Sequence, residues 1–182
     1  MIPRLRRSCL VLGSLALIVA LPACSARRTA ASAHPVTVPR PDLCTVLDHK
    51  AVRAALLGKV GGCAPEAGAD YYAVQFTGDA VVGHQRTPAS LTVAYTARYD
   101  PKTGLDRWAP FEEPAAGRVW MIGIGDVAVF AAKAAPGPQL LAVRKDLILT
   151  VALETGAVTV PQDRLPDHLL EVARGALDAL PR

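Results

Sequence analysis

The stretch SLTVAYTARY, residues 90–99, alternates apolar and polar side chains. Successive side chains of a β-strand point to opposite faces of the sheet, so this alternation predicts a strand with one buried face. The buried face would carry Leu91, Val93, Tyr95, Ala97 and Tyr99, and Thr92, Thr96 and Arg98 would lie on the other. We therefore expect an antiparallel sheet with one polar face.

Other segments add strands to this sheet. Residues 71–76, 118–124 and 126–133 have strand-like composition, and 138–154 is typical of a hairpin with its turn at 144–146. Residues 79–86 give a weaker signal, of a short edge strand. Residues 100–117 contain three prolines and two glycines, which predict a long loop with room for one helical turn.

Two helices are expected, one on each side of these strands in the chain. Residues 47–59 begin with Asp48 as N-cap, have Leu47 and Val52 placed for a hydrophobic staple, and would end at Gly58. A second helix enters near Asp163 and Pro166. Its apolar stripe comprises Leu165, Leu169, Val172, Ala176 and Leu180. The fold class is thus α+β: an antiparallel sheet of about five to six strands covered by a short N-terminal helix and a C-terminal helix.

The N-terminus has the pattern of an export signal. Arg4, Arg6 and Arg7 precede an apolar run over 9–20, which is shorter than the roughly 20 residues of a spanning helix. Leu21-Pro22-Ala23-Cys24 resembles the bacterial lipobox, in which a leucine and a small residue precede an invariant cysteine. That resemblance implies cleavage before Cys24 and a diacylglyceryl group on its sulfur. The alternative is an ordinary cleaved secretion signal. Its cleavage site would need two small residues, and Leu21-Pro22-Ala23 supplies only one.

This interpretation divides the chain into three parts. Residues 1–23 would be the lipoprotein signal peptide, 24–40 the lipidated cysteine with a flexible tether, and 41–182 one globular domain. The protein would then be exported and anchored to the outer face of the cell membrane.

Charge argues against a nucleic-acid partner. The chain has 20 basic and 16 acidic residues, and three of the basic ones, Arg4, Arg6 and Arg7, leave with the signal. The mature chain thus has 17 basic and 16 acidic residues, a net charge of +1. The basic residues are scattered singly and form no stripe along which a phosphate backbone could bind.

Cys44 and Cys63 remain once Cys9 leaves with the signal and Cys24 takes the lipid. An exported domain permits disulfides, so these two cysteines are expected to pair. The alternative is a metal or redox site, but neither cysteine lies in a C-x-x-C spacing.

The domain is similar to a group of actinobacterial lipoproteins of unknown function. The similarity rests on the segment 42–47 (DLCTVL) before a short helix, the second cysteine, the segment 123–128 (GIGDVA), and a late hairpin followed by a helix. The chain departs from that pattern at Val46, which stands in place of the first leucine, and in having no tryptophan directly following Cys63. The resemblance implies an envelope location and an α+β fold, and it supplies no catalytic residue.

Catalytic patterns are weak throughout the domain. Ser90 is its single serine and lacks the flanking glycines of a nucleophile elbow. His49, His84 and His168 are widely spaced. Glu112 and Glu113 are adjacent and so would point apart, and Gly123-Ile124-Gly125 lacks the third glycine of a dinucleotide site. We expect no enzyme activity, metal or cofactor.

Two functions remain, with an enzyme lacking a recognisable motif as a third. The first is a binding or accessory module that docks an envelope protein or lipid, with Trp108 and Phe111 in the long loop as the candidate partner contact. In the opposite interpretation, these two rings cap the sheet. The second function is a carrier of an apolar ligand, in a cavity lined by Leu56, Tyr95, Phe130 and Leu169. The sequence does not fix the partner or the oligomeric state.

Overall fold

The structure is a computed structural model that describes residues 36–112, 117–135, 137–156, 160–161 and 163–181. Its order of elements is α1 (Leu43–Val46), α2 (His49–Leu56), β1 (Gly58–Ala67), β2 (Tyr71–Val82), β3 (Gln85–Ala97), α3 (Ala109–Glu112), β4 (Arg118–Met121), β5 (Val127–Ala131), β6 (Gln139–Arg144), β7 (Leu147–Thr155) and α4 (Leu165–Asp178). The predicted α+β class is confirmed, with a seven-stranded sheet where about five to six strands were expected.

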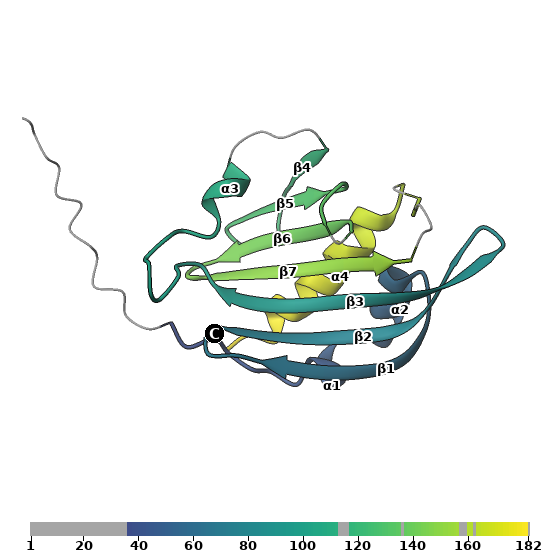
Figure 1. The fold of residues 1–182 in the computed structure, drawn as a ribbon, viewed down its shortest axis with the longest axis horizontal. Coiled ribbons are helices and arrows are strands. Elements are labelled where there is room, and N and C mark those ends of the chain that lie inside the picture. The colour runs from purple at the N-terminus through teal and green to yellow at the C-terminus, as the bar shows by residue number, and fades with distance from the viewer. Residues whose placement is uncertain (1–35, 113–116, 136, 157–159, 162, 182) are drawn as a thin grey trace, which may run out of the picture. The chain divides into compact units, whose positions relative to one another are not determined.

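All seven strands form one antiparallel sheet in the order β1-β2-β3-β7-β6-β5-β4. The helices α2 and α4 pack together behind one face of it (Figure 1). The first and last strands in that order, β1 and β4, are therefore its two edges. The C-terminal strands β4–β7 fold back so that β7 pairs with β3 in the middle of the sheet.

The main core lies between the sheet and these two helices. The alternation predicted over 90–99 holds up to Ala97: Leu91, Val93, Tyr95 and Ala97 are buried toward the helices, and Tyr99 lies beyond the strand and is 39% exposed. All five residues of the predicted helical stripe, from Leu165 to Leu180, are buried in the same core. Val38 is also buried there, so the folded domain begins before residue 41.

The first helical region differs from the prediction in its limits. Asp48 is the N-cap of α2, and its side chain accepts a hydrogen bond from the Lys50 N–H at 2.9 Å. The helix ends at Leu56, and Leu57 rather than Gly58 takes the left-handed conformation, with φ of 60°. Gly58 instead begins β1, which allows its Cα to lie against the carbonyl of Asp79 without a side chain between them.

The β2–β3 hairpin is longer than expected. Residues 79–86, predicted as a weak edge strand, belong to its distal part, and beyond Ala80, the last β2 residue paired with β1, the hairpin extends past the rest of the sheet (Figure 1). The turn at Gly83 has φ of 62°, a conformation that glycine adopts without strain.

The outer face of the sheet is only partly polar, which corrects the prediction. Thr92 and Thr96 do lie on it, but over β5–β7 it carries a second apolar cluster. This cluster comprises Trp108, Val129, Leu141, Val143 and Ile148, with Phe111 and Val127 at its margin. Trp108, just before α3, covers this cluster, and Phe111 within α3 packs at its margin.

Candidate interaction surface

The two edges of the sheet are protected very differently. Unpaired edge strands can pair with other chains, and natural proteins block them with charges, proline and bulges. The β1 edge has all three kinds of block: Lys59 and Glu66, Pro65, and a register shift between Val60 and Gly62. The disulfide from Cys63 to Cys44 also ties this strand to α1.

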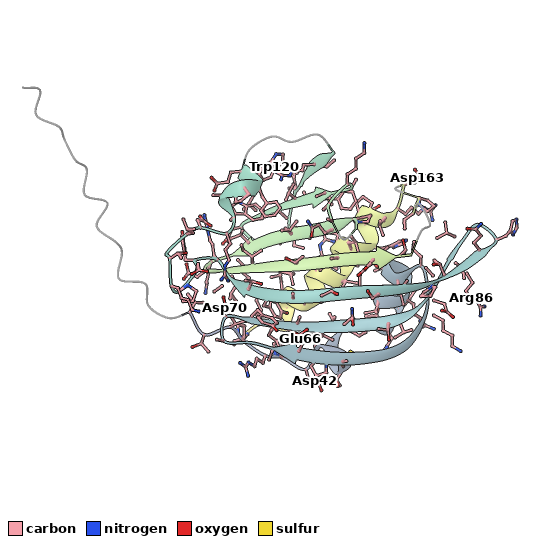
Figure 2. All side chains as sticks on the ribbon, viewed as in Figure 1. Asp42, Glu66, Asp70, Arg86, Trp120 and Asp163 are labelled. Atoms are coloured by element: carbon pink, nitrogen blue, oxygen red, sulfur yellow. A yellow bond between two sulfur atoms is a disulfide. The ribbon has the colours of Figure 1, made fainter. Side chains whose placement is uncertain are left out.

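The β4 edge is apolar and exposed. Val119 is 56% exposed, Trp120 48%, and Ile122, just after the strand, 92%. Figure 2 labels Trp120 on β4. Because cross-strand partners share a face, Trp120 lies on the outer face opposite Val129, whereas Val119 lies on the helix face opposite Phe130. We name Val119, Trp120 and Ile122, with the backbone of β4, the β4 edge.

The backbone of Trp120 faces away from β5. The Ala132 N–H donates to the Gly117 carbonyl at 3.1 Å, and these residues are in register with the β4–β5 pairs. Hydrogen-bonded and non-hydrogen-bonded pairs alternate along an antiparallel ladder. Val119 and Met121 therefore direct their N–H and C=O groups toward β5, and Trp120 directs its own outward.

Ion pairs hold the connector that leads into β4. Arg98, at the end of β3, donates to both carboxylate oxygens of Asp106, with a shortest distance of 2.7 Å. These hydrogen bonds from Arg98 lower the pKa of the Asp106 carboxyl. Arg107 donates to Asp70 at 2.5 Å and to Asp100 at 2.9 Å, so the connector is fastened to the β1–β2 turn as well.

The start and end of the β4 edge are also fixed. Arg118 stacks on the Phe111 ring, 5.1 Å from its centroid, and donates to the Pro110 carbonyl at 2.8 Å. After the strand, Gly123 and Gly125 have φ of 78° and 59°, and Ile124 between them is 5% exposed. The buried Ile124 anchors this turn, and Ile122 is left on the surface.

The predicted partner contact at Trp108 is not on the surface. Trp108 is 2% exposed and packs in the second cluster, with the Phe111 ring centroid 5.6 Å away. Trp108 therefore caps the sheet, as the opposite interpretation expected. Its ring covers the apolar outer face of β5–β7. Phe111 is half-buried at the margin of the same cluster.

Of the other predicted sites, the Cys44–Cys63 disulfide is present in the structure. Cys24 and the predicted signal peptide lie outside the described residues. Among the described residues, no helix has the length and apolar character needed to cross a membrane.

The side chains considered for catalysis lie apart. His49 is exposed on α2, His84 is exposed at the hairpin tip, and His168 is half-buried on α4. Ser90 lies within β3, opposite Thr77 and Glu154. In the described ranges, no three histidine, cysteine or acidic side chains gather as metal ligands would. Glu113 is outside those ranges.

Two open depressions flank Arg144. One, of about 240 Å³, has Val36, Leu147 and Leu180 among its lining residues. The other, of about 420 Å³, lies between the 123–126 turn and the end of α4, and Arg174 and Asp178 contribute to its wall. Neither includes Leu56, Tyr95, Phe130 or Leu169, which are buried in the main core.

No family model, curated protein or solved structure matches this chain. The sequence predicted a strand over residues 118–124 but did not indicate that this strand would lie at the edge of the sheet. That edge position exposes Trp120.

Proposed function

We propose that this chain is a membrane-anchored lipoprotein of the cell envelope that acts as a binding or accessory module, with the β4 edge as its docking surface. The observation that carries the proposal is the contrast between the two sheet edges. Lys59, Pro65 and Glu66 block β1, whereas β4 presents Val119, Trp120 and Ile122 to solvent. β4 is only four residues long, but its exposed apolar side chains and outward-facing backbone groups make it the edge that is open to pairing with another chain.

The anchor is supported by the sequence at the N-terminus. The lipobox-like Leu21-Pro22-Ala23-Cys24 and the short apolar run before it indicate lipidation of Cys24. Two or more acyl chains give stable attachment, since each buried methylene contributes about 0.8 kcal/mol. The resemblance to actinobacterial lipoproteins of unknown function agrees with an envelope location.

The carrier function has weaker support. The four side chains expected to line its cavity, Leu56, Tyr95, Phe130 and Leu169, are each at most 3% exposed and pack in one continuous core. The depressions beside Arg144 are open to solvent and lined partly by charged residues, unlike an enclosed apolar ligand site.

The anchor is tested by Cys24→Ala in the full chain. We expect the variant to leave the membrane fraction or to accumulate as an unprocessed precursor. The unchanged chain should incorporate labelled fatty acid, and Cys24→Ala should not. A variant that still fractionates as a mature membrane protein would contradict the anchor.

The docking surface is tested by a photoactivatable phenylalanine analogue at Trp120 of the full-length chain, expressed in cells. We expect a discrete cross-linked product that Val119→Lys with Ile122→Lys abolishes, because these charges block strand pairing. The control position is Val81 on the β2–β3 hairpin, which is 50% exposed. A product that survives the two lysines, or equal cross-linking from Val81, would contradict docking at the β4 edge.

A further inference from the structure

We propose that the occupant of the β4 edge is β4 of a second copy of this chain, paired antiparallel about a two-fold axis at Trp120. This inference rests on the proposed docking function and names its partner. The pairing would join two seven-stranded sheets into one continuous sheet across the dimer.

The backbone of β4 is self-complementary in this register. Trp120 directs its N–H and C=O away from β5, as the alternation from the Gly117–Ala132 pair requires. Placing Trp120 opposite Trp120 of the second copy lets each donate to the other's carbonyl. Val119 then lies opposite Met121 of the second copy, and Arg118 opposite Ile122.

The side chains fit the same register. The two Trp120 rings would meet on the outer face, where each is 48% exposed, and aromatic cross-strand pairs stabilise antiparallel sheets. On the helix face, Val119 would pack on Met121 of the second copy. Val119 and Trp120 thereby each gain an apolar neighbour, whereas Ile122 lies opposite Arg118.

Charge is compatible with this pairing. Arg118 is the charged residue of β4, and it would face Ile122 rather than another cation. The two copies of Arg118 would be offset by four residues, about 13 Å along the strands, at a rise of about 3.3 Å per residue. That exceeds the Debye length of about 8 Å at physiological ionic strength, so their repulsion is screened.

The contact is small, and its size indicates where it forms. A strand of four residues with a few apolar side chains falls short of the ~1,000 Å² that a stable interface in solution usually buries. Two copies anchored to one membrane, however, meet at a high effective concentration, which favours weak contacts. We therefore expect dimers on the membrane and monomers in dilute detergent solution.

The test uses single cysteines in the full-length, membrane-anchored chain. Cα atoms in a hydrogen-bonded antiparallel pair lie about 5.5 Å apart, within the disulfide range of about 4.4–6.8 Å. Trp120→Cys should therefore form an intermolecular disulfide in membranes under mild oxidation, seen as a dimer on a non-reducing gel. Val81→Cys, similarly exposed, and Ile122→Cys, four residues out of register with its own copy, should stay monomeric.

A second arm keeps Trp120 in place. Differently tagged copies carrying Val119→Cys and Met121→Cys should cross-link to each other when they are co-expressed, because this register makes them opposite neighbours. Thermal melts of each variant establish that the domain remains folded.

The outcomes separate the two proposals. Dimers of Trp120→Cys together with Val119–Met121 cross-links support self-pairing. If neither forms, while the photo-cross-link from Trp120 gives a different protein that the two lysines abolish, the second copy is overturned and docking stands. If no cross-link depends on the β4 edge, both proposals fail.

Discussion

The hydroxyl of Tyr95, on β3, donates a buried 2.5 Å hydrogen bond to the carbonyl of Ala176, near the end of α4. The last four carbonyls of a helix have no partner within it, so they need one elsewhere when they are buried. Arg144, on β6, supplies a second such partner by donating to the Leu177 carbonyl at 2.5 Å. These two bonds fix the C-terminal helix on the sheet.

Tyr95→Phe should lower the free energy of unfolding by about 1–3 kcal/mol, because the Ala176 carbonyl would be left buried without its partner. Tyr72→Phe is the matched control. Its ring stacks on Tyr95 with centroids 6.5 Å apart, and no hydrogen bond of its hydroxyl is found among the described residues. Urea unfolding measures both variants, and equal losses would contradict the role of the hydrogen bond.

Tyr95 should also make stability depend on alkaline pH. Burial raises its pKa above the ordinary value of 10.0, so the folded state holds the phenol proton more tightly than the unfolded chain does. Stability is then complete below about pH 10 and falls as the pH rises above it. In Tyr95→Phe this decline should be shallower. The measurement is the urea midpoint at pH 9 and at pH 11, which should fall less between the two pH values in Tyr95→Phe than in the parent.

Asp106 has the opposite pH dependence. Its pKa is held below the ordinary value of 3.8, chiefly by the Arg98 guanidinium, so its contribution is present above about pH 4 and is lost as acid protonates it. Asp106→Asn should lower the free energy of unfolding by about 1 kcal/mol at pH 7. The gap between variant and parent should close as the pH falls from 4 toward 2; a constant gap would show that charge is not the cause.

The sequence predicted those elements whose periodicity reflects burial on one face. The strand around Tyr95 and the stripe from Leu165 to Leu180 follow this rule, and both lie in the main core. β1 was missed because Gly58–Ala67 contains three glycines and a proline and has no alternation. It is a strand because β2 offers it a partner, and local composition does not encode that partner.

The candidate site was harder to predict for the same reason. Trp108 is in a polar, proline-containing segment, which left partner contact and sheet capping both open, and the strand-like run 118–124 gave no reason to single out Trp120. The strand order places β4 at an edge, which exposes Trp120, and it leaves the outer face of β5–β7 for Trp108 to cover. Strand order is a long-range property that no single segment determines.

The disulfide should contribute substantially to stability. Cys44 and Cys63 are 19 residues apart, and a loop of this length reduces the entropy of the unfolded chain by an amount equivalent to about 3 kcal/mol. Replacing both cysteines by alanine should lower the free energy of unfolding accordingly. Urea unfolding of oxidised parent, reduced parent and double variant checks this, and a double variant as stable as the oxidised parent would refute it.

The two tryptophans of the chain should respond oppositely to truncation. Trp108→Ala removes a ring that is 2% exposed from the cluster on the outer face, so it should lower the free energy of unfolding by about 3–5 kcal/mol. Trp120→Ala removes a ring that is 48% exposed, and it should change that free energy by about 0.5 kcal/mol or less.

Both alanine variants are measured by urea unfolding in dilute detergent, followed by circular dichroism, since either substitution alters the fluorescence. Cross-linking at the β4 edge should show the reverse order: Trp120→Ala, with the photoactivatable residue moved to Val119, should lose its product. Trp108→Ala, with the same probe, should keep the product at temperatures where it remains folded. Equal loss of stability in the two variants would mean that Trp120 belongs to the core, and the β4 edge would then lose its central side chain.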